Sequence, residues 1–331
     1  MAVLANLDRK TRYSLLAGLA LQAAAVIGLI SFFGAREGTG PRQESGPDSW
    51  DVALQSVRFD SVEEVERLFA RLSYHWPLAE GSLVPRIAID PLPGDYQAGL
   101  EVSRKKALFF RAMLPLALAE NGEIRKQREF VKRVRDRAGV PLDARSRERL
   151  RLLFGQYRVE MTEDLTAAID ALLQRMDEIP PALLLAQAAN ESAWGTSRFA
   201  RLANNLFGQW TWRDGQGIVP LERPEGESYA VRKFPSLRAS VRDYIHNLNI
   251  GHAYEELRAL RSRQRQAGQP LDALALAAGL TRYSQRGEAY VDEIRSIIRG
   301  NRLEVLADVG LAPPGAQVAV SDGDPVRSTG G

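Results

Sequence analysis

Most of the chain places apolar residues three or four positions apart, which is the spacing of one helix face. One such run follows Asp60 or Ser61, either of which can cap a helix. The longest run covers residues 102–137, where we expect a kink at Pro115 and a break at residues 121–122. Further helices are predicted over residues 146–154, 162–176, 180–194, 236–248, 253–266, 271–278 and 288–298. The pattern therefore predicts a mainly α-helical protein.

A different pattern covers residues 209–234, where short alternating segments replace the helical spacing. Trp210 and Trp212 alternate with polar residues, and a turn-rich loop follows them. Residues 218–220 and 229–234 have the composition of two further short strands. We therefore expect a small β lobe inserted between helices.

Residues 13–33 form an uncharged and largely apolar run, and about 20 apolar residues are enough for a helix to cross a bilayer. Arg9, Lys10 and Arg12 precede the run, which favours a cytoplasmic N-terminus. A cleaved signal peptide is the competing interpretation, but its apolar core is shorter and ends in a small-x-small site. Residues 31–35 fit such a site poorly. The sequence thus predicts an uncleaved membrane anchor.

Composition limits the chemistry that the chain can perform. The 331 residues include no cysteine, so disulfides and thiolate metal sites are excluded. The net charge of +3 is too small to indicate nucleic acid as a partner, and the three scattered histidines lack zinc-site spacing. We expect no cofactor. Residues 121–151 hold 11 Lys or Arg against 5 Asp or Glu, which fits either a face for anionic polymers or lipid headgroups, or an ordinary solvated helix surface.

The predicted helix after Pro180 carries the most specific chemical signal. Its Ala/Leu-rich run places Leu184, Ala188 and Glu191 on one face, and Gly195 is a stop signal. A glutamate at the end of an apolar helix is either a solvated helix-end residue or a functional carboxylate. The helix pattern alone leaves both interpretations open.

The motif around Glu191 resembles that of a known enzyme family. The sequence AQAANESAWGTSRFA at 186–200, followed by NNLFG at 204–208, is similar to bacterial glucosaminidases of the lysozyme-like superfamily, glycoside hydrolase family 73, and most of all to the Bax-like group. The resemblance extends from about residue 165 to about residue 300 and continues through residues 219–220, 232–234, 244–249 and 283–290. It implies an α+β lysozyme-like fold and favours the functional interpretation of Glu191.

The resemblance implies that Glu191 is the general acid of glycoside cleavage, which requires a poorly solvated carboxylic acid. A second carboxylate is expected in the β lobe, where Glu222, Glu225 and Glu227 are candidates. Glu222 is preferred because its spacing from Phe234 fits best. The N-acetyl group of the substrate could replace a second carboxylate, so the stereochemical outcome stays open.

Aromatic rings are expected to form sugar subsites, because sugar C–H faces pack on them. Six residues are predicted to bind substrate or shape its site: Trp194, Asn205, Phe207, Trp210, Trp212 and Tyr244. Tyr283, Gly287 and Tyr290 are interpreted as packing positions.

These observations predict a sequence of segments along the chain. They are a cytoplasmic stub (1–12), an anchor (13–33), a flexible linker (34–56), a helical N-terminal region (57–160), a catalytic domain (161–305) and a disordered tail (306–331). The predicted function is periplasmic hydrolysis of peptidoglycan glycan strands after N-acetylglucosamine by an inner-membrane protein, with cell-wall protein partners possible through 57–160. The alternatives are a lytic transglycosylase with one catalytic glutamate and a non-catalytic wall-binding or scaffolding protein.

Overall fold

The computed structural model describes residues 50–97, 99–137, 139–221, 223–224 and 226–315. Within these ranges no helix is long and apolar enough to cross a membrane, and the predicted anchor at 13–33 lies outside them. The described part of the chain is mainly helical, as the apolar spacing predicts.

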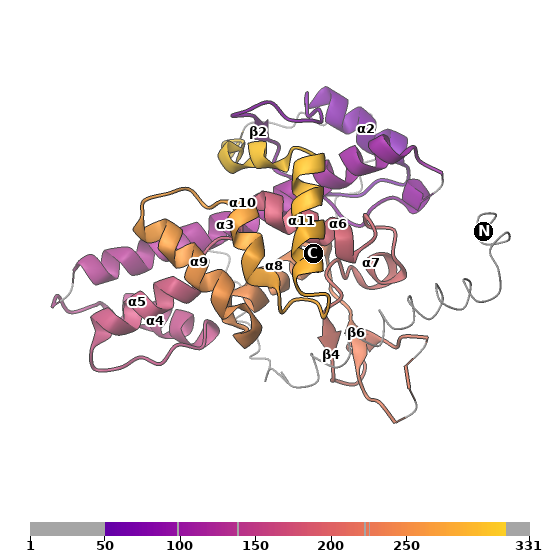
Figure 1. Ribbon diagram of the computed structural model, residues 1–331. Coiled ribbons are helices and arrows are strands. Elements are labelled where there is room, and N and C mark those ends of the chain that lie inside the picture. The colour runs from indigo at the N-terminus through magenta and orange to yellow at the C-terminus, as the bar shows by residue number, and fades with distance from the viewer. Residues whose placement is uncertain (1–49, 98, 138, 222, 225, 316–331) are drawn as a thin grey trace.

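The longest element is α3, Val102–Asp136, which runs from the middle of the molecule to its left end in Figure 1. The other helices before the β lobe are α2 (Val62–Arg71), α4 (Ala144–Gln156), α5 (Leu165–Arg175), α6 (Pro181–Glu191) and α7 (Arg198–Ala203). After the lobe come α8 (Leu237–Ile250), α9 (Glu255–Gln266), α10 (Ala273–Leu276) and α11 (Glu288–Gly300). Short 3₁₀ turns lie at Gly94–Gln97, His252–Tyr254, Ala277–Leu280 and Leu303–Asp308.

The helix α3 continues through residues 121–122, so the predicted break there is wrong. Asn121 donates a hydrogen bond to the carbonyl of Ile179 at 2.7 Å and accepts one from its N–H at 3.1 Å. Gly122 leaves room for Val52, whose side chain would lie 3.1 Å from a Cβ at that position. Tertiary contacts thus make use of two residues whose local preference is to end a helix.

One hydrophobic core joins the predicted N-terminal region to the predicted catalytic domain. Phe109, Phe110 and Met113 of α3 are fully buried, as is most of α6, which packs directly against α3. The apolar cluster continues without interruption from Val57 to Val309. The predicted boundary at 160/161 therefore lies between segments that share a core.

A buried ion cluster also crosses this boundary. Asp177, between α5 and α6, lies 3.2 Å from Arg128 of α3 and 2.9 Å from Arg265 of α9. The fully buried Arg261 of α9 lies 3.9 Å from the same carboxylate. Burial by itself would raise the pKa of Asp177, but the three arginines lower it.

Within the part of the chain that the structure describes, the strands are short and form three small sheets. The predicted β lobe is present as an antiparallel sheet of order β4-β6-β5, in which Trp210 is opposite Val231. Two parallel pairs, β1-β3 and β2-β7, lie outside the lobe. The strands are β1 (Gln55–Val57), β2 (Leu83–Val84), β3 (Ile87–Ile89), β4 (Trp210–Thr211), β5 (Gly217–Ile218), β6 (Ala230–Arg232) and β7 (Gly310–Leu311).

Two of these strands occupy segments that the sequence predicts to be irregular. The strand β1 and the packed residues from Trp50 onward overlap the end of the predicted linker at 34–56. The strand β7 and the buried Leu306 overlap the start of the predicted tail at 306–331. In both places a few apolar residues bury themselves against the core, although their surroundings have the composition of loops.

Candidate active site

Helix α6 carries Glu191 at its C-terminal end, as the sequence predicts. Pro181 occupies the first turn, where a missing N–H leaves no bond unmade. The residues from Ala182 to Ala189 are all buried, so packing fixes the helix on every side. The helix ends at Glu191, and the side chain of Glu191 is partly exposed.

The turn after α6 has an unusual backbone. Ala193, Trp194 and Gly195 have φ values of 50°, 60° and 78°, all in the left-handed region. The hydroxyl of Ser192 holds this turn, because it accepts a hydrogen bond from the N–H of Gly195 at 2.7 Å and donates one to the carbonyl of Ala188 at 2.6 Å. A Cβ at Gly195 would lie 2.9 Å from a methyl group of Leu92, so glycine is required there for space as well as conformation.

A chain of side-chain hydrogen bonds holds the carboxylate of Glu191. The hydroxyl of Tyr290, on α11, donates to Glu191 Oε1 at 2.9 Å. The same hydroxyl accepts from Gln187 Nε2 at 2.9 Å, and Gln187 Oε1 accepts in turn from the hydroxyl of Tyr244 on α8. Asn190 donates to Glu191 at 3.3 Å. Three helices therefore fix the orientation of one carboxyl group.

Burial raises the pKa of Glu191 above its ordinary value. The hydrogen bonds from Tyr290 and Asn190 act in the opposite direction, because they stabilise the ionised form. Glu293 raises the pKa further and Arg286 lowers it, and these two residues form an ion pair at 2.7 Å. A carboxyl group in this environment can hold a proton at a higher pH than a free glutamate and can still reach a ligand.

Aromatic rings surround the hydrogen-bond chain. Tyr283 and Tyr290 are stacked with their centroids 5.3 Å apart and an interplanar angle of 9°. Phe207 and Tyr244 are stacked at 3.9 Å and 10°. Because these rings pack against one another, they exclude water from the helix-facing side of the site and contribute to the raised pKa of Glu191.

Three of the residues predicted to bind substrate are buried in the structure. Phe207 and Tyr244 have 4% and 1% of their surface exposed, so their stacked faces meet each other. Among the described residues, the side chain of Asn205 bonds to backbone groups, including the carbonyls of Gln209 and Arg232 at 2.8 Å and 2.9 Å. In the described conformation all three residues shape the walls of the site.

The three predicted tryptophans differ in exposure. Trp194 is partly exposed and packs edge-on against Phe110 at 5.3 Å. Trp210 is partly exposed on β4 and packs edge-on against Tyr229 at 4.8 Å. Trp212 has 43% of its surface exposed. Trp210 and Trp212 are therefore the predicted ring positions that the β lobe leaves most available.

The second predicted carboxylate lies mostly outside the described residues, which exclude Glu222 and Glu225. Glu227 is described and is exposed. Glu222 as a second catalytic residue therefore stays a prediction.

Two residues of the site were not identified as functional from the sequence. The sequence predicts a packing role for Tyr290, but its hydroxyl also bonds to Glu191. Gln187 precedes Glu191 by four positions and so lies on the same helix face, which was the available signal. No sequence spacing indicates that Tyr290 bonds to Glu191, because the two residues are 99 positions apart.

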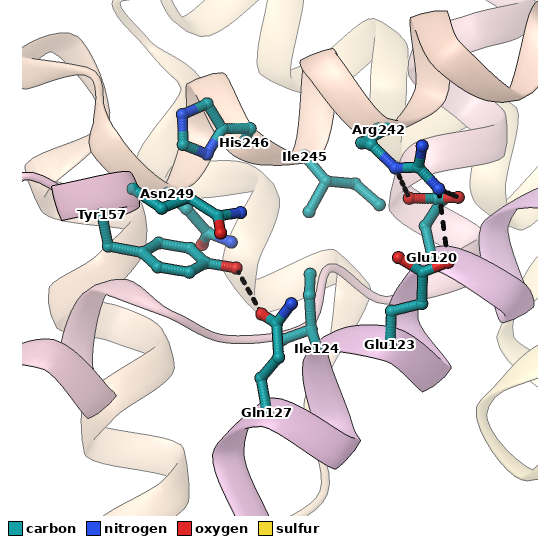
Figure 2. Close-up of a pocket in the computed structure, with 10 residues that line it drawn as sticks. Glu120, Glu123, Ile124, Gln127, Tyr157, Arg242, Ile245, His246 and Asn249 are labelled. Carbon is teal, nitrogen blue, oxygen red and sulfur yellow. Dashed lines mark hydrogen bonds and ion pairs between the residues drawn. The ribbon is translucent and has the colours of Figure 1, made fainter. Parts of the chain in front are cut away.

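A separate polar cavity of about 50 Å³ lies between α3, α4 and α8 (Figure 2). Burial and the nearby Glu120 raise the pKa of Glu123 to about 7, while burial and Arg158 lower that of His246 to about 4. The cavity is lined by Glu120, Glu123, Ile124, Gln127, Gln156, Tyr157, Arg242, Ile245, His246 and Asn249. No residue of α6 lines it, so it is not part of the Glu191 site. Among the residues that the structure describes, no three His, Asp or Glu side chains are placed to hold a metal ion.

Comparison with known proteins places this site in a family. Residues 167–303 match the family described as glucosaminidase, mannosyl-glycoprotein endo-β-N-acetylglucosaminidase. The chain is 31% identical over 206 residues to Protein bax of Escherichia coli (strain K12), an alignment that covers 62% of this chain and 72% of that protein. The chain belongs to the Bax-like family of glucosaminidase-domain proteins. No solved structure gives a significant match.

The glucosaminidase domain contains every member of the hydrogen-bond chain described above. Gln187, Glu191, Tyr244 and Tyr290 all fall within the matched residues 167–303. Helix α3, which packs behind α6, precedes the matched range. The Bax-like protein therefore supports its glucosaminidase domain with a helix from outside that domain.

Proposed function

We propose that this Bax-like protein is an endo-β-N-acetylglucosaminidase that cleaves the β-1,4 bonds of peptidoglycan after N-acetylglucosamine, with Glu191 as general acid. The observation that carries the proposal is the position of Glu191 at the end of a buried helix, with a raised pKa and a hydrogen bond from Tyr290. The glucosaminidase domain supports a glycosidase.

The proposed chemistry follows from the state of Glu191. The protonated carboxyl group donates its proton to the oxygen of the leaving sugar as the glycosidic bond breaks. A positive charge then develops on the other sugar ring. Glu222 or the substrate's N-acetyl group stabilises or attacks that ring, and water completes the hydrolysis.

A lytic transglycosylase is the second candidate, since it needs a single glutamate. Glu191 at the end of α6 is a carboxylate that could serve alone in this role. A non-catalytic wall-binding protein is a third candidate, but it gives no reason for the hydrogen-bond chain to Glu191.

We also propose that residues 13–33 anchor the protein in the inner membrane with its catalytic domain in the periplasm. The uncharged apolar run and the basic residues before it support this placement. A catalytic domain in the periplasm would have peptidoglycan as its β-1,4-linked glycan substrate.

Analysis of digestion products tests the proposed activity. Purified sacculi incubated with the full chain should release fragments with reducing N-acetylglucosamine ends, which mass spectrometry after borohydride reduction identifies. Anhydro-muramic ends would instead establish the transglycosylase. Binding to sacculi without soluble products would establish the non-catalytic candidate. A high-mannose glycopeptide is the comparison substrate, because the family's description names mannosyl glycoproteins.

Replacement of Tyr290 by Phe should change the pH profile of the enzyme. The Tyr290 hydroxyl lowers the pKa of Glu191, so its loss should raise that pKa further. The alkaline limb of the kcat/KM profile should therefore move to higher pH, and kcat should fall about 10-fold as the acid loses its fixed orientation. Initial rates on sacculi across a pH series measure both effects.

Tyr283→Phe is the matched control for this experiment. Tyr283 stacks on Tyr290, but its hydroxyl bonds to the backbone carbonyl of Phe207 at 3.3 Å. We expect the alkaline limb of the kcat/KM profile of Tyr283→Phe to stay at the wild-type position. An unmoved limb in Tyr290→Phe, or an equal movement in both variants, would contradict a role for Tyr290 in positioning Glu191.

A further inference from the structure

The described chain begins at Trp50, whose side chain packs between basic residues of α3 and α4. The ring of Trp50 lies 5.4 Å from that of Phe130 on α3, and the guanidinium of Arg149 on α4 lies 3.8 Å from the Trp50 ring. Lys126 donates a hydrogen bond to the backbone carbonyl of Asp51 at 2.9 Å. Trp50 is thus held between two helices that both contribute cations.

The same helix faces carry further basic residues. On α3, Arg133 and Arg137 follow Lys126 by 7 and 11 positions, which keeps all three on one side of the helix. On α4, Arg145 precedes Arg149 by one turn. Four of these five residues are exposed, and Arg149 is partly exposed. We call the set Lys126, Arg133, Arg137, Arg145 and Arg149 the Trp50 face.

Basic residues outnumber acidic ones in the segment that carries this face, because residues 121–151 hold 11 Lys or Arg against 5 Asp or Glu. Glu129 lies among the basic residues of α3, three positions after Lys126 and four before Arg133, and Asp136 is 3.4 Å from Arg135. Glu148 on α4 is paired with Arg151 at 2.7 Å. The Trp50 face therefore presents a local excess of positive charge.

The start of the described chain lies on this face. Val52 packs at the level of Gly122, and Trp50 packs at the level of Phe130. Followed from residue 52 back to residue 50, the chain thus runs along α3 toward that helix's C-terminal end. Sixteen residues, 34–49, separate the predicted anchor at 13–33 from Trp50.

We propose that the Trp50 face docks on anionic phospholipid headgroups of the membrane that holds residues 13–33, an inference that rests on the proposed membrane anchor. Lys and Arg side chains next to a bilayer bind anionic headgroups, and this attraction falls with ionic strength. Because the anchor keeps the protein at the bilayer, a modest attraction is enough to orient it.

Docking at this face gives the region before the glucosaminidase domain a specific role. Trp194, three residues after Glu191, packs on Phe110, which is 20 positions before Phe130 on α3. At about 1.5 Å per residue, this part of α3 spans about 30 Å. Helix α3 therefore separates the Glu191 site from the docked face by about this distance along its axis.

Single-cysteine labelling tests this orientation, because the chain has no native cysteine. Val140, four residues after the end of α3, and Leu202, on α7, are both exposed. The full chain carrying Val140→Cys or Leu202→Cys, labelled with a donor dye, is placed in nanodiscs that contain headgroup-labelled acceptor lipids. We expect high energy transfer from position 140 and low transfer from position 202 when phosphatidylglycerol is present. Raised salt, or phosphatidylcholine alone, should abolish the difference.

Charge reversal separates the Trp50 face from general attraction. Arg133→Glu with Arg137→Glu should shift the ratio of docked to undocked protein by on the order of 100-fold toward the undocked state. The matched control, Arg201→Glu with Arg299→Glu, makes the same change in net charge at two exposed positions elsewhere and should leave energy transfer at position 140 unchanged.

Each other outcome overturns the docking proposal. Equal transfer from both positions, or no effect of phosphatidylglycerol, would show that the Trp50 face does not bind lipid. High transfer from position 140 only after addition of an anionic wall polymer would assign the face to that polymer. Failure of the chain to enter nanodiscs would remove the anchor and the docking together, while the product analysis on sacculi would still decide the enzymatic activity.

Discussion

Replacing Glu191 with Gln should lower kcat on peptidoglycan by about 10³-fold, because the amide cannot protonate the leaving oxygen. The substitution should leave the fold intact, since Gln has the same shape and its carbonyl can still accept the hydrogen bond from Tyr290. Clearance of sacculus turbidity measures activity, and thermal unfolding measures stability.

The raised pKa of Glu191 adds a second expectation for the same variant. An acid whose pKa is higher in the folded than in the unfolded state loses its stabilising contribution as pH rises through the folded-state value. Gln does not titrate, so Glu191→Gln should gain thermal stability relative to wild type between acid and neutral pH. A constant difference in Tm across this range would contradict the raised pKa.

Two further variants make the activity result specific. Glu256→Gln changes an exposed carboxylate on α9 and should retain wild-type turnover. Glu222→Gln tests the predicted second carboxylate and should resemble Glu191→Gln if that residue acts on the sugar ring. If Glu191→Gln keeps most of the wild-type turnover, Glu191 is not the general acid.

Replacing Asp177 with Asn should destabilise the protein by about 3–5 kcal/mol, because it leaves the fully buried Arg261 without a charged partner. The loss also removes the link from Arg128 of α3 to Arg265 of α9. Chemical denaturation of the full chain, followed by tryptophan fluorescence and circular dichroism, measures the free energy of unfolding. If α3 and the glucosaminidase domain share one core, a single transition should move as a whole.

Glu178→Gln is the matched control for Asp177→Asn. Glu178 is the next residue and pairs with Arg125 and Arg265, but Arg125 is largely exposed. We expect the variant to lose no more than about 1 kcal/mol. Two separate transitions in the wild type, or equal losses in both variants, would contradict a buried cluster that joins the two regions.

The sequence predicted the elements where local signals agree with the tertiary fold. The capping box of Ser61 and Glu64 is formed at the start of α2. The Ala/Leu run before Glu191 forms α6. Each of these features depends on residues within a few positions of one another, so the sequence displays them directly.

The elements that the sequence missed depend on distant contacts. The break expected at residues 121–122 does not occur, because Asn121 bonds to Ile179 and Gly122 accommodates Val52. The strand β7 pairs with β2, more than 200 residues earlier, inside a segment with the composition of a tail. Local propensity cannot report a partner that lies elsewhere in the chain.

The site shows the same division. By itself the sequence determined a helix that ends in Glu191, the turn and β lobe that follow, and a resemblance to glucosaminidases. The tertiary structure alone decided that Tyr290 and Tyr244 hold that carboxylate through Gln187, and that Phe207 and Tyr244 are buried against each other. The physical reason is that the pKa and orientation of a carboxyl group depend on which side chains surround it, and here these come from helices about 50 to 100 residues apart.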